Sequence, residues 1–158
     1  MKNILFVCTG NTCRSSMAEA ILRQEALEQK LELNVRSAGT AVFQSSGASR
    51  GAIQAAGELG IDLSKHRSQQ VTKELVDEAD LILTMTHSHK QQLLHYFPHA
   101  QEKIFTLAEF ASEESMQNIS DPFGGNLEVY MECRNEIHMH IRKLLHKLYS
   151  QRKGENEK

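Results

Sequence analysis

The chain has 158 residues, the length of one domain, and 40% of them are hydrophobic and 24% charged, as in ordinary globular proteins. The 18 Lys and Arg residues against 20 Asp and Glu residues give a formal net charge of −2, which excludes a general electrostatic attraction to nucleic acid or to an anionic membrane. The apolar run Ile4–Val7 is too short for a signal-peptide core, and three cysteines are an odd number. We therefore expect a cytoplasmic protein with reduced thiols.

The chain opens with a predicted strand, a loop and a helix. Residues Ile4–Cys8 form a continuous apolar run, typical of a strand buried on both faces of a parallel sheet. Beyond a polar loop, the apolar residues within Met17–Leu22 share one helical face. Ser16 and Glu19 have the spacing of a capping box, which predicts that the helix begins near Ser15 or Ser16.

Strand and helix patterns alternate along the remaining sequence. We predict strands over 33–36, 81–83 and 104–105, and helices over 48–59, 72–78, 88–97 and 127–148. Residues 106–125 are expected to be mostly irregular, and 151–158 to form a charged, disordered tail after a domain over 1–150. The alternation predicts a single α/β domain, a four-stranded parallel sheet with helices on both faces. The binding crevice of such a sheet lies at the carboxyl ends of its strands.

The loop after the first strand has the most informative sequence, Cys8-Thr9-Gly10-Asn11-Thr12-Cys13-Arg14-Ser15. Between a buried strand and a helix start, successive backbone N–H groups can surround an anion, and the helix dipole favours negative charge there. Gly10 and Asn11 accept the left-handed backbone angles that such a curve needs. The planar guanidinium of Arg14 can bind two phosphate oxygens. We predict a phosphate-binding loop whose substrate-binding residues are Thr9, Gly10, Asn11, Thr12, Cys13 and Ser15.

Cys8 lies at the base of this predicted loop. The positive field that binds a phosphate also stabilises a thiolate, so we predict that Cys8 is the nucleophile and forms a cysteinyl-phosphate intermediate. Ser15 is placed to donate a hydrogen bond to the sulfur. The alternative is structural: Cys8 ends a core strand, and Arg14 is a solvated helix residue.

Phosphoryl transfer to sulfur needs an acid for the leaving group and then a base for the attacking water. Asp121 is the candidate, because it lies in a loop immediately before Pro122 and shortly before Gly124-Gly125. Alternatively, Asp121 only starts a turn.

His87 and His89 form an H-x-H pair near the expected crevice, but no further ligand is evident in the sequence, so we predict no metal and no cofactor.

The pattern C-x5-R-S within the first fifteen residues, followed by a late Asp-Pro-aromatic, resembles the low-molecular-weight protein tyrosine phosphatase family. The resemblance extends over almost the whole chain, from residue 4 to about 148. It implies a flavodoxin-like sheet, with Cys8 as nucleophile, Arg14 as phosphate clamp and Asp121 as general acid and base.

The resemblance also implies a support for the loop asparagine. Family members hold it through a serine and a histidine, which correspond to Ser37 and His66 beside Asn11. The proline that usually follows the serine after the arginine is replaced here by Ser16. Its loss concerns the rigidity of the first helical turn rather than the chemistry.

Two details resemble a narrower group, the bacterial protein-arginine phosphatases. These are Thr12, where tyrosine phosphatases usually have a branched aliphatic residue, and the sequence Asp121-Pro122-Phe123-Gly124-Gly125. In that group the threonine is associated with the choice of phosphoarginine. We therefore predict a phosphatase that hydrolyses phosphoarginine on proteins, with Phe123 in contact with the substrate. The alternative is a tyrosine phosphatase in which Thr12 is neutral variation.

The remaining cysteines bear on regulation and on competing functions. We hypothesise that oxidation forms a reversible Cys8–Cys13 disulfide; alternatively, Cys13 is a buried spectator.

An arsenate reductase would need a further cysteine pair, but only Cys133 lies outside the loop. A phosphocarrier domain would need neither Arg14 nor Asp121, and a silent phosphate-binding module would bind without forming a phosphoenzyme. The expected partners are phosphorylated proteins, and a monomer is expected.

Overall fold

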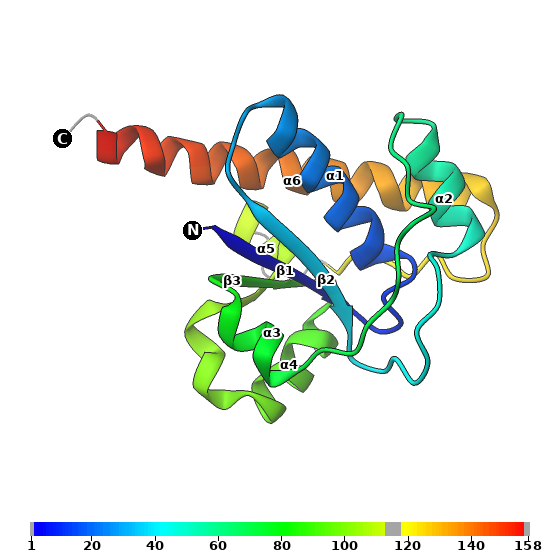
Figure 1. Cartoon of the computed structure of the whole chain (residues 1–158), viewed down its shortest axis with the longest axis horizontal. Helices are drawn as coiled ribbons and strands as arrows, with labels where there is room; N and C mark the ends of the chain where they lie inside the picture. The colour runs from blue at the N-terminus through cyan, green and yellow to red at the C-terminus, as the bar shows by residue number, and fades with distance from the viewer. Residues whose placement is uncertain (1, 113–117, 157–158) are drawn as a thin grey trace.

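The computed structural model describes the chain over residues 2–112 and 118–156, with side chains up to residue 150 (Figure 1). Four strands, β1 (Asn3–Cys8), β2 (Asn34–Gly39), β3 (Leu81–Thr84) and β4 (Ile104–Thr106), form one parallel sheet in the order β2-β1-β3-β4. The predicted fold class is therefore confirmed. Cys8, the last residue of β1, is paired with Gly39, the last residue of β2.

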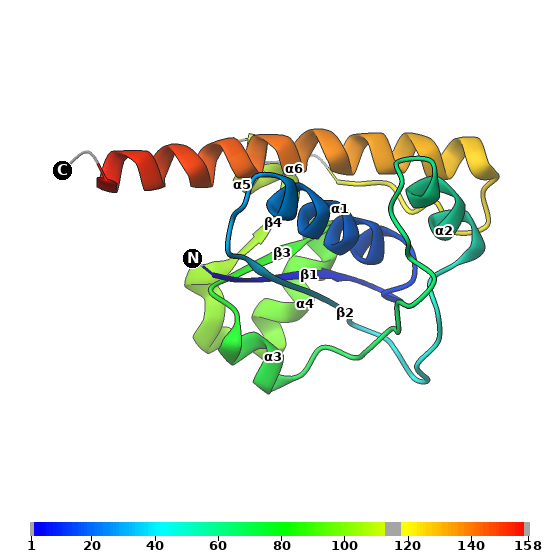
Figure 2. The same ribbon diagram turned by 45° about the horizontal axis from the view of Figure 1, so that its top comes forward.

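Helices cover both faces of the sheet (Figure 2). Because β1 alternates its side chains, Ile4 and Phe6 enter one hydrophobic core, and Leu5 and Val7 enter the other. This explains the uninterrupted apolar run at the start of the sequence. The first core is covered by α1 (Arg14–Glu28), α2 (Arg50–Gly57), α5 (Leu107–Ser112) and α6 (Leu127–Asn156), and the second by α3 (Lys73–Glu78), α4 (His87–Tyr96) and the 3-10 helix η1 (Pro98–Lys103).

The predicted capping box at the start of α1 is wrong. The helix begins at Arg14, and its N-cap residue, Cys13, makes no capping hydrogen bond through its side chain. Ser16 lies inside the helix, where its hydroxyl donates to the Cys13 carbonyl at 2.8 Å. The carboxylate of Glu19 instead accepts a hydrogen bond from Ser37 at 2.9 Å. The N-cap side chain therefore leaves the first amides of this helix free of a capping bond.

Helix α5 lies in the stretch 106–125 that the sequence predicted as mostly irregular. Six residues are too few for a helical period to stand out, although Leu107 and Ala108 are buried. Residues 113–117 of the same stretch lie outside the described residues.

Helix α6 continues to Asn156, beyond the predicted end of the domain at residue 150. Gln, Arg, Lys and Glu are good helix formers, so a charged composition alone does not end a helix. The division into a domain over 1–150 and a tail stays a prediction, and residues 157–158 lie outside the described residues.

Although α6 has 30 residues, neither it nor another helix in the described ranges is apolar and long enough to cross a membrane.

Candidate active site

The loop between β1 and α1 is held by its backbone carbonyls, which accept hydrogen bonds from surrounding elements. The carbonyls of Cys8 and Thr9 accept from the backbone N–H groups of Thr40 at 2.9 Å and Ala41 at 3.0 Å. The Thr12 carbonyl accepts from the Ser49 N–H at 2.9 Å, and the Asn11 carbonyl accepts from Nε2 of His66 at 2.7 Å. In a trans peptide the N–H points opposite to the carbonyl. The amides that follow these carbonyls therefore face the inside of the loop, as an anion site requires.

The sulfur of Cys8 lies inside this ring of amides. It accepts a hydrogen bond from the backbone N–H of Asn11 at 3.3 Å and lies 2.9 Å from the hydroxyl oxygen of Ser15. Because the Asn11 amide group donates to that same oxygen at 2.7 Å, the hydroxyl proton of Ser15 is free to point at the sulfur. Ser15 thus has the position predicted for it. Two hydrogen-bonding groups, the Asn11 N–H and the Ser15 hydroxyl, thus face the Cys8 sulfur.

Arg14 is buried beside the loop and keeps one donor free. Its Nη1 donates to the Ile119 carbonyl at 3.0 Å, and its Nη2 lies 3.6 Å from the Asp121 carboxylate. Its Nε is buried and has no hydrogen-bond partner among the described residues. A buried N–H without a partner is costly unless a ligand completes it. A phosphate oxygen satisfies that requirement.

Asp121 and Phe123 lie at the open side of the site. The Asp121 side chain is 52% exposed, and its Oδ1 accepts a hydrogen bond from the Phe123 N–H at 3.1 Å. The ring of Phe123 is exposed to solvent. The structure thus brings the predicted acid to the predicted clamp, Arg14, and leaves an aromatic side chain free beside it.

Asn11 is held in place within the loop, as the resemblance implied, but through partly different contacts. Its φ of 58° lies in the left-handed region, and its side chain is fully buried. Its Oδ1 accepts from the Gln69 N–H at 3.0 Å, and its backbone carbonyl contacts His66. The expected contact between His66 and Asn11 is therefore present, and it is made by the backbone carbonyl of Asn11.

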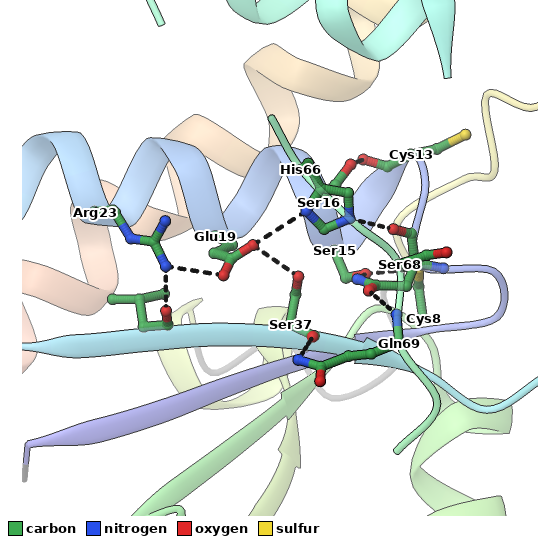
Figure 3. A network of polar contacts seen from close by, with 12 residues as sticks. Cys8, Cys13, Ser15, Ser16, Glu19, Arg23, Ser37, His66, Ser68 and Gln69 are labelled. Carbon is green, nitrogen blue, oxygen red and sulfur yellow. Dashed lines mark hydrogen bonds and ion pairs between the residues drawn. The ribbon is translucent and has the colours of Figure 1, made fainter. Parts of the chain in front are cut away.

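The serine expectation needs a correction, which Figure 3 makes visible. Ser37 does not contact Asn11; its hydroxyl donates to Oε2 of Glu19. That oxygen lies 3.5 Å from Nδ1 of His66, whose other nitrogen contacts the Asn11 carbonyl. Glu19 therefore connects Ser37 to the loop. The spacing of Ser16 and Glu19 predicts a helix cap, but a local spacing cannot reveal that the partner of Glu19 is Ser37, 18 residues away.

Cys13 lies in the same loop but faces other residues. Its thiol donates to the Ser49 hydroxyl at 3.3 Å and lies 3.4 Å from the hydroxyl of Tyr130. Burial and the neighbouring Cys13 raise the pKa of Tyr130. Both loop cysteines are free thiols, so the hypothesised Cys8–Cys13 disulfide stays a prediction. Cys133, on the buried side of α6, has its pKa raised to about 12 by burial.

One residue beside the loop was misread in the sequence, and an exposed aromatic residue in a neighbouring segment was missed. His89, considered only as half of an H-x-H pair, is buried and lies 2.9 Å from the Thr9 hydroxyl. Phe43 is 98% exposed, in the segment after β2 whose residue Ala41 contacts the loop. An aromatic residue within a polar loop was the signal for Phe43. No cluster of three or more potential metal-ligating side chains occurs in the described ranges.

The comparisons with known proteins agree with this architecture. The family described as low molecular weight phosphotyrosine protein phosphatase matches residues 3–154. The chain belongs to this family.

Among individual relatives, the protein-arginine-phosphatase of Bacillus subtilis is 42% identical over 96% of the chain and 99% of its own length. The protein-arginine-phosphatase of Geobacillus stearothermophilus is 44% identical over 94% of the chain and 97% of its own length. The tyrosine phosphatase PtpB of Staphylococcus aureus is 36% identical over 89% of the chain and 95% of its own length.

Solved structures show the same relationship. A cysteine-to-serine variant of the arginine phosphatase YwlE, with its active-site serine phosphorylated, is 41% identical with a TM-score of 0.90, over 96% of this chain and 98% of that one. The YwlE enzyme of Geobacillus stearothermophilus is 43% identical with a TM-score of 0.89, over 96% and 95%.

Proposed function

We propose that this protein hydrolyses phosphoarginine on proteins through a cysteinyl-phosphate intermediate on Cys8. The observation that carries the proposal is the ring of inward-facing amides around the Cys8 sulfur, completed by the unpartnered Nε of Arg14. The similarity over almost the full length to two arginine phosphatases supports the choice of substrate. The partners are then phosphorylated proteins, met in the cytoplasm by a monomeric enzyme.

The first step transfers the phosphoryl group to sulfur. The Cys8 thiolate attacks phosphorus, an S–P bond forms, and the P–N bond to the guanidine breaks. Asp121 supplies the proton to the departing nitrogen, because a neutral guanidine is a far better leaving group than its anion. The loop amides and Arg14 hold the three equatorial oxygens on which the charge is spread.

The second step releases phosphate. Water attacks the phosphorus of the cysteinyl phosphate, and the carboxylate of Asp121, now deprotonated, accepts the proton of that water. The S–P bond breaks, and the electron pair returns to Cys8 as thiolate. The hydroxyl of Ser15, 2.9 Å from the sulfur, stabilises the thiolate as leaving group.

Thr12 supports arginine over tyrosine as the substrate side chain. Its backbone is fixed by the hydrogen bond from Ser49, and its side chain is half-buried at the rim of the loop. A hydroxyl there can hydrogen-bond a planar guanidinium, which carries several donors, whereas an aliphatic side chain packs better on a phenol ring. The exposed ring of Phe123, two residues after Asp121, is an apolar surface that either substrate side chain could contact.

The substrate is tested by comparing turnover of phosphoarginine and phosphotyrosine peptides by the wild type, Thr12→Val and Thr12→Ile. Thr12→Val removes the hydroxyl at nearly constant volume, so it separates hydrogen bonding from shape. We expect the wild type to prefer phosphoarginine, and both variants to lose about three- to tenfold of that preference. A wild-type preference for phosphotyrosine would favour the second candidate, a tyrosine phosphatase, for which the Staphylococcus relative is the precedent.

The intermediate is tested by Cys8→Ser. We expect hydrolysis of either phosphopeptide to be lost, because a serine hydroxyl is a far weaker nucleophile, and a poorer leaving group from phosphorus, than a thiolate. Full turnover by Cys8→Ser would overturn the mechanism for both substrates.

A further inference from the structure

His89 joins the start of α4 to the first residue of the phosphate-binding loop. It is 3% exposed and lies between two hydroxyl groups. Its Nε2 is 2.9 Å from Oγ1 of Thr9, and its Nδ1 is 3.1 Å from Oγ1 of Thr86, the N-cap residue of α4. The backbone N–H of His89 also donates to that Thr86 oxygen at 3.2 Å. The imidazole therefore bridges two elements that are 77 residues apart, counted from Thr9 to Thr86 (86 − 9).

Thr9 is held from both sides of β1. On the β2 side its backbone carbonyl accepts from the Ala41 N–H at 3.0 Å, and a Cβ on Gly39 would lie 2.4 Å from that carbonyl oxygen. On the β3 side its side chain contacts His89. The side chain of Thr9 would otherwise rotate freely, because this residue is exposed. Together these contacts fix the Thr9–Gly10 peptide with its N–H inside the loop.

The protonation state of His89 fits this bridging role. Burial and the neighbouring Arg14 lower its pKa to about 4, against an opposing effect of Asp121. The ring is therefore neutral at pH 7, with one donor and one acceptor nitrogen for its two hydroxyl partners. A neutral ring also avoids a second positive charge beside Arg14.

We propose that His89 is a positioning residue for phosphate binding, which acts by fixing Thr9 and with it the first peptides of the loop. This inference rests on the proposed function, since it concerns the same anion site. Its measurement is the binding of inorganic phosphate rather than hydrolysis, so the two ideas fail separately. Wild type that does not bind phosphate would count against the proposed function. Wild type that binds phosphate while the His89 variants bind equally well would count against His89 alone.

Two substitutions separate the two bonds of the ring. His89→Gln places an amide near the position of Nε2, so it can keep the bond to Thr9 and lose the side-chain bond to Thr86. His89→Asn places its amide near Nδ1, so it keeps the bond to Thr86 and loses the bond to Thr9. If His89 only caps α4, His89→Asn should bind phosphate more tightly than His89→Gln. If His89 positions Thr9, His89→Gln should bind phosphate more tightly than His89→Asn.

The dissociation constant of inorganic phosphate, measured by titration calorimetry, distinguishes these outcomes. We expect His89→Gln to remain within about twofold of the wild type, and His89→Asn to bind about three- to tenfold more weakly, as for the loss of one hydrogen bond. Thermal unfolding of each variant identifies any loss that comes from misfolding. Wild-type affinity in both variants, or tighter binding by His89→Asn than by His89→Gln, would overturn the proposal.

Thr9→Val decides the case in which both variants bind weakly. This change removes the hydroxyl that His89 contacts while keeping the shape of the side chain. If His89 acts through Thr9, Thr9→Val alone weakens phosphate binding, and adding His89→Asn weakens it no further. Additive losses, or normal binding by Thr9→Val, would show that His89 acts elsewhere and would overturn the proposal.

Discussion

The guanidinium of Arg14 lies 3.6 Å from the carboxylate of Asp121, although the two residues are 107 positions apart in the sequence (121 − 14). The arginine is buried, whereas the carboxylate is half-exposed, so water weakens their attraction. The pair therefore adds little stability, but it sets where the predicted acid lies relative to the predicted phosphate clamp.

Asp121→Asn should lower kcat on a phosphoarginine peptide by about 10²- to 10⁴-fold, because the proton that Asp121 gives to the leaving nitrogen is then lost. Affinity for inorganic phosphate should change little, since the amides and Arg14 remain. Steady-state kinetics and phosphate titration measure the two effects. Asp62→Asn is the control, because Asp62 is exposed and its carboxylate accepts hydrogen bonds from Ser64 within its own turn. A kcat for Asp121→Asn within threefold of the wild type would contradict its role.

Gly39→Ala should destabilise the fold and reduce kcat/KM. The added Cβ would lie 2.4 Å from the Thr9 carbonyl oxygen and 2.6 Å from a Val42 methyl group, so the loop must move. We expect the free energy of unfolding to fall by about 1–3 kcal/mol, as for other overpacked sites. Gly57→Ala is the matched control: nothing lies within 4 Å of its Cβ, and alanine in α2 should stabilise by up to about 1 kcal/mol. Urea unfolding distinguishes the two signs.

Glu19→Gln tests the support behind the loop. The carboxylate accepts from Ser37 and from Arg23 at 3.0 Å and faces His66, whose ring holds the Asn11 carbonyl. Its neutralisation should lower the free energy of unfolding by about 1–3 kcal/mol and weaken phosphate binding, because these are hydrogen bonds to a charged group. Arg23→Gln should have a small effect, because that side chain is 62% exposed. Equal effects of the two changes would contradict the support role.

The stability of the protein should decrease as the pH falls through the range set by His89. Its pKa is about 4 in the folded chain, below the ordinary value of 6.5. Between these values the unfolded chain binds a proton that the folded chain does not, so acid favours unfolding. A shift of this size corresponds to about 3 kcal/mol at the acid end of the window. His89→Gln should flatten the difference in urea-unfolding free energy between pH 7 and pH 4.5, and parallel pH curves for the two proteins would contradict this.

Mild peroxide should produce a Cys8–Cys13 disulfide, seen by intact mass as the loss of two hydrogens and reversed by reductant. The Cys13 sulfur must first leave the hydroxyls of Ser49 and Tyr130. Tyr130→Phe should therefore accelerate the reaction, and Cys13→Ser should abolish it. An unchanged mass in the wild type would leave Cys13 as a buried spectator.

The sequence predicted those parts of the molecule that depend on neighbouring residues. The Ile4–Cys8 run and the loop after it identified the central strand and the anion site, because burial and turn chemistry are local. Contacts between distant segments could not be predicted in this way. The bond from His89 to Thr9 spans 80 residues. Glu19 reaches His66 only because β2 and the segment after α2 lie beside α1 (Figure 3). A single sequence contains no periodic signal for such pairs.

The outward-facing carbonyls of the loop are bonded to residues 40, 41, 49 and 66, and its first side chain is bonded to α4. No short fragment of the chain can therefore form the anion site, since its walls come from segments spread over most of the sequence. A phosphate ion bound there acts as a reversible cross-link among those segments. If the loop binds phosphate as proposed, only the folded chain binds it, so millimolar phosphate in the buffer should raise the melting temperature by mass action. Buffers free of phosphate therefore give the intrinsic stability of the protein.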